Sequence, residues 1–83
     1  MFYRYKTDGT CSAYIDVEMD GNVLTECTFH GGCNGNLKGI GSLVEGMDAD
    51  EVIARLEGTT CGMKNTSCPD QLAQALKQAK ENA

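Results

Sequence analysis

The hydrophobic period of the chain changes once, near the middle, and this change limits the fold more than any other feature. Between Cys11 and Met19 apolar and polar residues alternate, as in a strand with one buried face. The alternating apolar positions are Cys11, Ala13, Ile15, Val17 and Met19. Asp20-Gly21 then favours a tight hairpin turn and an antiparallel return strand. That strand is expected to bury Val23, Thr25, Cys27 and Phe29 on one face, and Phe2 to Thr7 is expected to add a short edge strand.

The second half of the chain predicts three helices. The first has the apolar stripe Leu37, Ile40 and Val44 and ends at Gly46. The second begins at Asp48, whose capping-box partner is Glu51, and ends at Gly58. The third opens with Ser67-Cys68-Pro69-Asp70, because proline is favoured in the first turn and an acid there suits the helix dipole. Its buried stripe is expected to be Leu72, Ala73, Leu76 and Ala79.

This order predicts one α+β domain over residues 1–83: a small antiparallel sheet of two or three strands, followed by three helices packed on one face. A core of this size rarely supplies more than about 3 to 5 kcal/mol, so a metal, a disulfide or a second subunit is expected to hold the fold. The residues after Met1 to Lys6 contain no long apolar segment, which predicts neither a signal peptide nor a membrane span and favours the cytoplasm.

Charge and cysteine count narrow the function. The net charge is -5 and no basic cluster occurs, which argues against nucleic-acid binding because phosphate neutralisation supplies most of that affinity. Thiols stay reduced in the cytoplasm, and an odd count of 5 cysteines prevents complete internal pairing. Metal binding or redox use is therefore favoured over a disulfide scaffold.

The cysteines differ in their predicted settings. Cys27 lies mid-strand and is interpreted as a core thiol, whereas Cys11 starts a strand and suits either the core or a functional loop. Cys33 and Cys68 each precede or open a helix, where free N–H groups and the positive end of the dipole stabilise a thiolate. Cys61 lies in the loop before the third helix, and its spacing to Cys68 is not that of a zinc ribbon or a redox motif.

Other chemical groups are sparse. His30 is the single histidine, and its phase opposite to Phe29 predicts a solvent-facing strand residue rather than a ligand or proton carrier. The sequence contains no Ser-His-Asp order, paired-carboxylate arrangement or Walker loop. An enzyme built on these residues alone is not expected.

Residues Thr66 to Asp70 spell TSCPD, and the chain resembles the four-cysteine TSCPD-domain family of small bacterial proteins. The segments Gly31 to Leu37 and Thr66 to Leu72 carry most of the resemblance, which extends over nearly the whole chain. A related domain occurs at the C-terminal end of adenosylcobalamin-dependent ribonucleotide reductases. The resemblance implies that the four cysteines of the family correspond to Cys11, Cys33, Cys61 and Cys68.

The chain is more distantly similar to iron–sulfur scaffold proteins of the IscU and NifU type. The shared order is a cysteine at a strand start, a hairpin, a loop with a second cysteine entering a helix, and a last cysteine opening the C-terminal helix, here Cys11, Cys33 and Cys68. Those scaffolds follow the first cysteine with Gly-Asp, whose aspartate assists metal exchange, whereas this chain has Ser12-Ala13. The likeness implies converging cysteines more than cluster assembly.

The leading hypothesis is a cytoplasmic metal-binding module in which Cys11, Cys33, Cys61 and Cys68 bind zinc or an iron–sulfur centre, with zinc favoured. The alternative is an accessory thiol domain linked to ribonucleotide reduction, with Cys61 and Cys68 forming a reducible disulfide. The partner would be a ribonucleotide reductase or the iron–sulfur machinery. The oligomeric state stays open.

Overall fold

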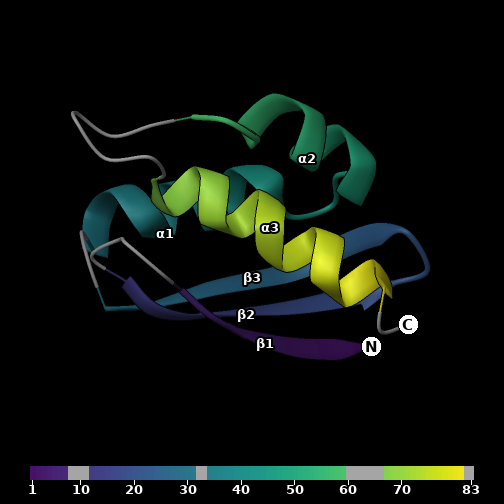
Figure 1. The fold of residues 1–83 in the computed structure, drawn as a ribbon, viewed down its shortest axis with the longest axis horizontal. Helices are drawn as coiled ribbons and strands as arrows, with labels where there is room; N and C mark the ends of the chain where they lie inside the picture. Colours follow the sequence, from purple (N-terminus) through teal and green to yellow (C-terminus); the bar gives the residue numbers. More distant parts are fainter. Residues whose placement is uncertain (8–11, 32–33, 60–66, 82–83) are drawn as a thin grey trace.

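The computed structural model describes residues 1–7, 12–31, 34–59 and 67–81 as a sheet covered on one side by three helices (Figure 1). The antiparallel sheet has the order β1-β2-β3, with β1 at Phe2–Lys6, β2 at Ser12–Asp20 and β3 at Val23–Gly31. The helices are α1 at Asn34–Val44, α2 at Ala49–Leu56 and α3 at Cys68–Glu81. The predicted α+β fold and element order are confirmed.

The core lies between the sheet and α3. Ile15 and Val17 on β2 are at most 1% exposed and belong to the same buried cluster as Leu72 and Leu76 of α3. These α3 positions recur at three- and four-residue spacing, so one face of the helix meets the apolar face of the strand. The predicted stripe Leu72, Ala73, Leu76 and Ala79 is confirmed, because each of its side chains is fully buried.

The inner face of β3 differs from the alternation predicted for it. Val23 and Thr25 are exposed, whereas Leu24 is fully buried together with Cys27. The pairing shifts between Glu18 and the next residue of β2, which makes Thr25 an extra residue in β3. The Thr25 hydroxyl donates to the carbonyl oxygen of Glu18 at 3.0 Å. The prediction for Val23 and Thr25 is wrong because this bulge changes the phase of the strand.

A second bulge lies where β2 begins. Ser12 pairs with Gly31 and Tyr14 with His30, so Ala13 is an extra residue on β2 and its side chain is exposed. The predicted burial of Ala13 is therefore wrong. The three later positions of the alternation are confirmed as buried: Ile15, Val17 and Met19.

The helix boundaries follow the predicted caps. Asp48 is the N-cap of α2, and its carboxylate accepts the backbone N–H groups of Asp50 and Glu51 at 3.1 and 3.3 Å. The Glu51 side chain accepts from Nε of Arg55 at 2.8 Å, so the described hydrogen bonds form only the Asp48 half of the predicted capping box. None of the described helices is long and apolar enough to span a lipid bilayer.

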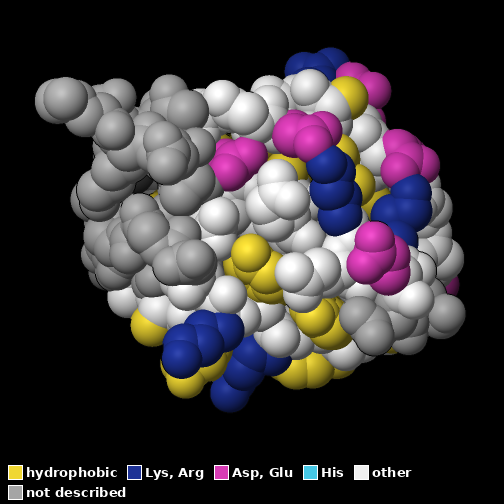
Figure 2. All heavy atoms as spheres, viewed as in Figure 1, with side chains coloured by type: hydrophobic (Ala, Val, Ile, Leu, Met, Phe, Trp, Pro, Cys, Tyr) yellow, Lys and Arg dark blue, Asp and Glu magenta, His cyan; other side chains and the backbone are white. Residues whose placement is uncertain are grey.

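The outer surface over α2 and α3 carries interleaved charges of both signs (Figure 2). Lys77 of α3 pairs with Glu57 just after α2, and Lys80 pairs with Asp50 near the start of α2. These pairs are partly exposed, so each contributes little to stability, but they fit α2 lying against α3. The described surface over α2 and α3 contains no single basic patch of the kind a nucleic acid would require.

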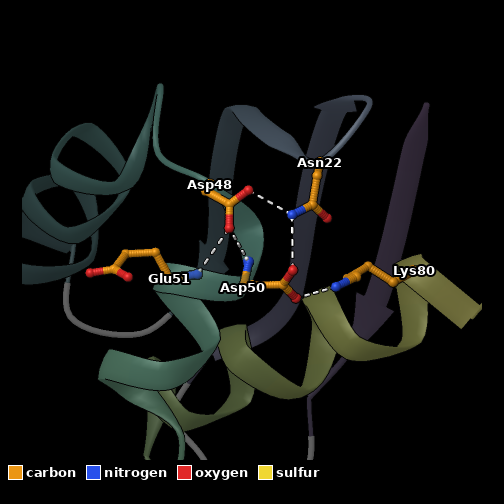
Figure 3. Close-up of polar contacts among 5 residues, drawn as sticks. All are labelled: Asn22, Asp48, Asp50, Glu51 and Lys80. Carbon is orange, nitrogen blue, oxygen red and sulfur yellow. Dashed lines mark hydrogen bonds and ion pairs between the residues drawn. The ribbon is translucent and has the colours of Figure 1, made fainter.

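A polar network joins the hairpin turn to the helices (Figure 3). The side-chain amide of Asn22 donates to Asp48 at 2.6 Å and to Asp50 at 3.0 Å, and Asp50 also pairs with Lys80. The backbone N–H of Ala49 donates to the carbonyl oxygen of Asn22 at 2.7 Å. One end of the domain is thus fixed by hydrogen bonds from β2-β3, α2 and α3.

Gly41 allows α1 to lie directly on β3. A Cβ atom built at Gly41 would be 2.8 Å from the carbonyl oxygen of Cys27, closer than real contacts of this kind. The neighbouring atom belongs to the backbone of a sheet strand, which cannot rotate away. By contrast, a Cβ atom at Gly39 would meet no heavy atom within 4 Å outside its own helix.

We expect Gly41→Ala to lower the free energy of unfolding by about 1 to 3 kcal/mol, because the added methyl group forces α1 away from β3. Gly39→Ala is the matched control and should raise it by about 0.5 to 1 kcal/mol through helix propensity. Urea titrations of the two variants provide the measurement. Equal effects in the same direction would contradict a close contact specific to Gly41.

Candidate metal centre

Cys68 is the first residue of α3. Its side chain is 8% exposed. The preceding Ser67 caps the helix, because its hydroxyl accepts the backbone N–H of Asp70 at 3.2 Å and donates to the carbonyl oxygen of Thr59 at 2.7 Å. Cys68 therefore lies at the N-terminal end of a 14-residue helix, where the helix dipole is positive.

Asp70 has a role that the sequence did not predict. Its carboxylate accepts the backbone N–H of Gly58 at 2.8 Å, and its side chain is 7% exposed. Gly58 follows α2 with a φ of +84°, a left-handed conformation that favours glycine. Together Ser67 and Asp70 attach the end of α2 to the start of α3. Cys68, between them, is the residue of the motif suited to metal or redox chemistry.

Removing this hydrogen bond should be measurable. We expect Asp70→Ala to lower the free energy of unfolding by about 1 to 3 kcal/mol, because it removes the charged acceptor of a partly buried hydrogen bond from the N–H of Gly58. Asp70→Asn keeps an acceptor oxygen and should cost clearly less. Thermal and chemical denaturation of both variants test this expectation. Losses of the same size would show that the acceptor atom is not what matters at residue 70.

Cys27 confirms the interpretation of a core thiol. It lies in β3 with 7% of its surface exposed and belongs to the hydrophobic core. Burial, reinforced by the negative charge of Glu45, raises the pKa of Cys27 to about 12. The thiol is therefore neutral at physiological pH. Because metals bind the thiolate, Cys27 is poorly suited to be a ligand.

The other three predicted ligands, Cys11, Cys33 and Cys61, lie outside the described residues. Two of them adjoin described backbone at the same end of the sheet. Ser12, the first residue of β2, pairs with Gly31, the last residue of β3. Residue 11 directly precedes the former, and residue 33 follows the latter by two positions and directly precedes α1.

The starts of α1 and α3 lie toward this same end of the domain, as Figure 1 shows. Thr59, two positions before residue 61, is held there by the hydroxyl of Ser67. The described residues next to each of the four cysteines therefore belong to one end of the domain. Among the described residues alone, no three potential metal ligands gather at one point.

His30 lies on the other face of the sheet and is exposed, as predicted. Its Nε2 is 2.7 Å from the Asp16 carboxylate, which also accepts two hydrogen bonds from the Arg4 guanidinium at 2.7 and 2.9 Å. The Arg4 hydrogen bond, with a smaller contribution from His30, outweighs burial and lowers the pKa of Asp16 from 3.8 to about 2. Arg4, Asp16 and His30 therefore form an ion-pair cluster on the sheet face opposite the helices.

The lowered pKa of Asp16 predicts a pH effect on stability. The folded carboxyl has the lower pKa, so its contribution is complete above pH 4 and is lost as the pH falls from about 4 to about 2. Because Arg4 is 56% exposed, we expect about 1 kcal/mol or less. Asp16→Asn should therefore lose less stability than the wild type over this interval. Parallel acid-unfolding slopes in the two proteins would contradict the assignment.

Comparison with known protein families decides the classification. Residues 3–80 match the TSCPD domain. The chain belongs to the TSCPD-domain family. No curated protein and no solved structure gave a significant match, so the comparisons add no support to the likeness with iron–sulfur scaffold proteins. Within the TSCPD motif, Ser67 supplies the cap of α3, Cys68 the thiol and Asp70 the acceptor for Gly58 described above.

Proposed function

We propose that this TSCPD domain is a cytoplasmic metal-binding module whose cysteine ligands are Cys11, Cys33, Cys61 and Cys68. One observation supports the proposal. The start of β2, the end of β3 and the starts of α1 and α3, which lie next to these cysteines in the sequence, are all at one end of the domain. Cys68 lies at the positive N-terminal end of a helix, whereas burial raises the pKa of Cys27 and holds it neutral in the core.

The donor set suits zinc. Four thiolates form the closed tetrahedral shell typical of structural zinc sites. The aspartate that follows the first cysteine of cluster scaffolds has no counterpart here, because Ser12-Ala13 occupies those positions. When bound, the ion would act as a cross-link rather than as a catalyst.

Such a cross-link would matter to the fold. The four cysteines are separated by 21, 27 and 6 intervening residues, so one ion would tie together distant parts of the sequence. Because a small core leaves little margin, metal binding is expected to contribute a large part of the folding free energy. The chain is also too small to hold a ribonucleotide reductase barrel with its cobalamin and nucleotide sites, so we do not propose catalysis by this domain alone.

Metal content provides the first test. Protein purified without oxygen should contain about one zinc ion per chain, the ratio for a four-thiolate site. Cys68→Ser should lose the ion and most of the thermal stability, because the ligand shell is incomplete. Cys27→Ser is the matched control and should retain the ion while losing only packing energy. Equal metal content in wild type and Cys68→Ser would refute the proposed ligand set.

The same preparation separates zinc from the two alternatives. A zinc site is colourless, whereas brown protein with stoichiometric iron and sulfide would identify an iron–sulfur centre. Protein without metal that forms a reversible disulfide between Cys61 and Cys68 would instead support a thiol relay beside a ribonucleotide reductase. The position of Cys68 at a helix start is the observation that favours this second function, since it suits an attacking thiolate as well as a ligand.

A further inference from the structure

The sheet face opposite the helices carries charge of opposite sign at its two ends. Cross-strand pairing forms one row from Lys6, Tyr14 and His30, and another, four residues along β2, from Phe2, Glu18 and Glu26. The row between them contains Arg4 and Asp16, which neutralise each other. The first row is therefore basic and the second acidic. Figure 2 shows basic side chains gathered over one part of β1 at the lower edge of the molecule.

The acidic row is incompletely balanced within the chain. Glu18 and Glu26 are directly opposite each other, and like charges in this position destabilise a sheet. The N-terminal ammonium lies 3.4 Å from Glu18, whereas Glu26 forms no ion pair with any described residue. A hollow of about 220 Å³ opens beside these carboxylates, with Phe2 in its lining. Phe2 is 60% exposed, so its phenyl ring is accessible to a partner.

The basic row is the complement of this acidic row. Lys6 is exposed and, among the described residues, forms no ion pair. Tyr14 beside it is 41% exposed. An ammonium group is attracted both to a carboxylate and to the face of an aromatic ring. The ammonium group of Lys6 is therefore complementary to the phenyl ring of Phe2 and the carboxylate of Glu18, which lie at the other end of the same face.

We propose that two copies of the chain associate through this face, around a two-fold axis that lies in the interface and runs across the strands. This axis reverses the strand direction, so the basic row of each copy lies on the acidic row of the other. Lys6 of one copy then meets Phe2 and Glu18 of its partner, and the contact occurs twice in a closed, isologous dimer. A two-fold axis parallel to the strands would instead place the acidic row of one copy on the acidic row of the other.

The size of the face predicts a weak dimer. Three strands about 4.8 Å apart and rows about 6.6 Å apart give a contact of about 14 by 20 Å, which is smaller than a stable interface and fits only weak, transient association. The contact is also polar, so salt should weaken it. Because the strands run in opposite directions, the two Cys68 ends lie at opposite ends of the dimer. The residues of the proposed contact, Lys6, Phe2 and Glu18, are not among the proposed metal ligands.

Sedimentation equilibrium of the full chain tests the proposal, using concentrations up to about 1 mM, the weak limit of specific association. The wild type should form a concentration-dependent dimer. Lys6→Glu and Glu18→Lys should each weaken it at least tenfold, because each brings like charges together in both copies of the contact. Lys38→Glu on α1 makes the same charge change away from the face and should leave the dimer unchanged.

Mixing the two interface variants provides the decisive result. Lys6→Glu and Glu18→Lys have complementary faces, so a mixture should form a heterodimer although neither variant pairs with itself. Circular dichroism of each variant establishes that its fold is retained. A wild type that stays monomeric over the whole range, a dimer that both variants leave intact, or a mixture that fails to associate would each overturn the proposal. Binding of a basic peptide to this face without self-association would also overturn it.

Discussion

The contact between the apolar stripe of α3 and the inner face of β2 holds this domain together. Leu72 and Leu76 are fully buried against Ile15 and Val17, in a core with few other large side chains. Three alanines of α3, at positions 73, 75 and 79, are also fully buried, so the helix backbone lies close to its neighbours. This contact fixes the direction of α3 over the sheet. It thereby also fixes the position of Cys68 at the start of the helix.

The sequence predicted the features that depend on local periodicity and capping. The stripe of α3, the Asp48 cap and the glycines that follow α1 and α2 were all readable, because each depends on residues within one turn. The two bulges could not be predicted from the sequence, because a shift of strand pairing at Thr25 or Ala13 depends on contacts across the sheet. The same limit explains Asp70, whose acceptor role joins it to Gly58, 12 residues earlier.

The candidate site likewise has some features that local sequence patterns predicted and one, the grouping of its cysteines, that they did not. The core position of Cys27 followed from its strand phase, although the phase of its neighbours Val23 and Thr25 was wrong. The helix start at Cys68 followed from the Ser-Cys-Pro-Asp order. No local pattern relates residues 11, 33, 61 and 68 to one another. Their grouping came from family resemblance, and what the fold adds is that described backbone beside each of them lies at one end.

The two ends of the domain are stabilised differently. At the hairpin turn, Asn22 joins Asp48 and Asp50, and Asp50 reaches α3 through Lys80, so side-chain as well as backbone hydrogen bonds connect the strand turn to the helices (Figure 3). At the opposite end, the hydrogen bonds of Ser67 to Thr59 and of Asp70 to Gly58 connect α3 to the segment after α2. Nothing in those two contacts ties α3 to the start of β2 or α1. A metal held by the four proposed cysteine ligands would add a cross-link between these places, which gives that ligand set a structural reason in a chain with so small a core.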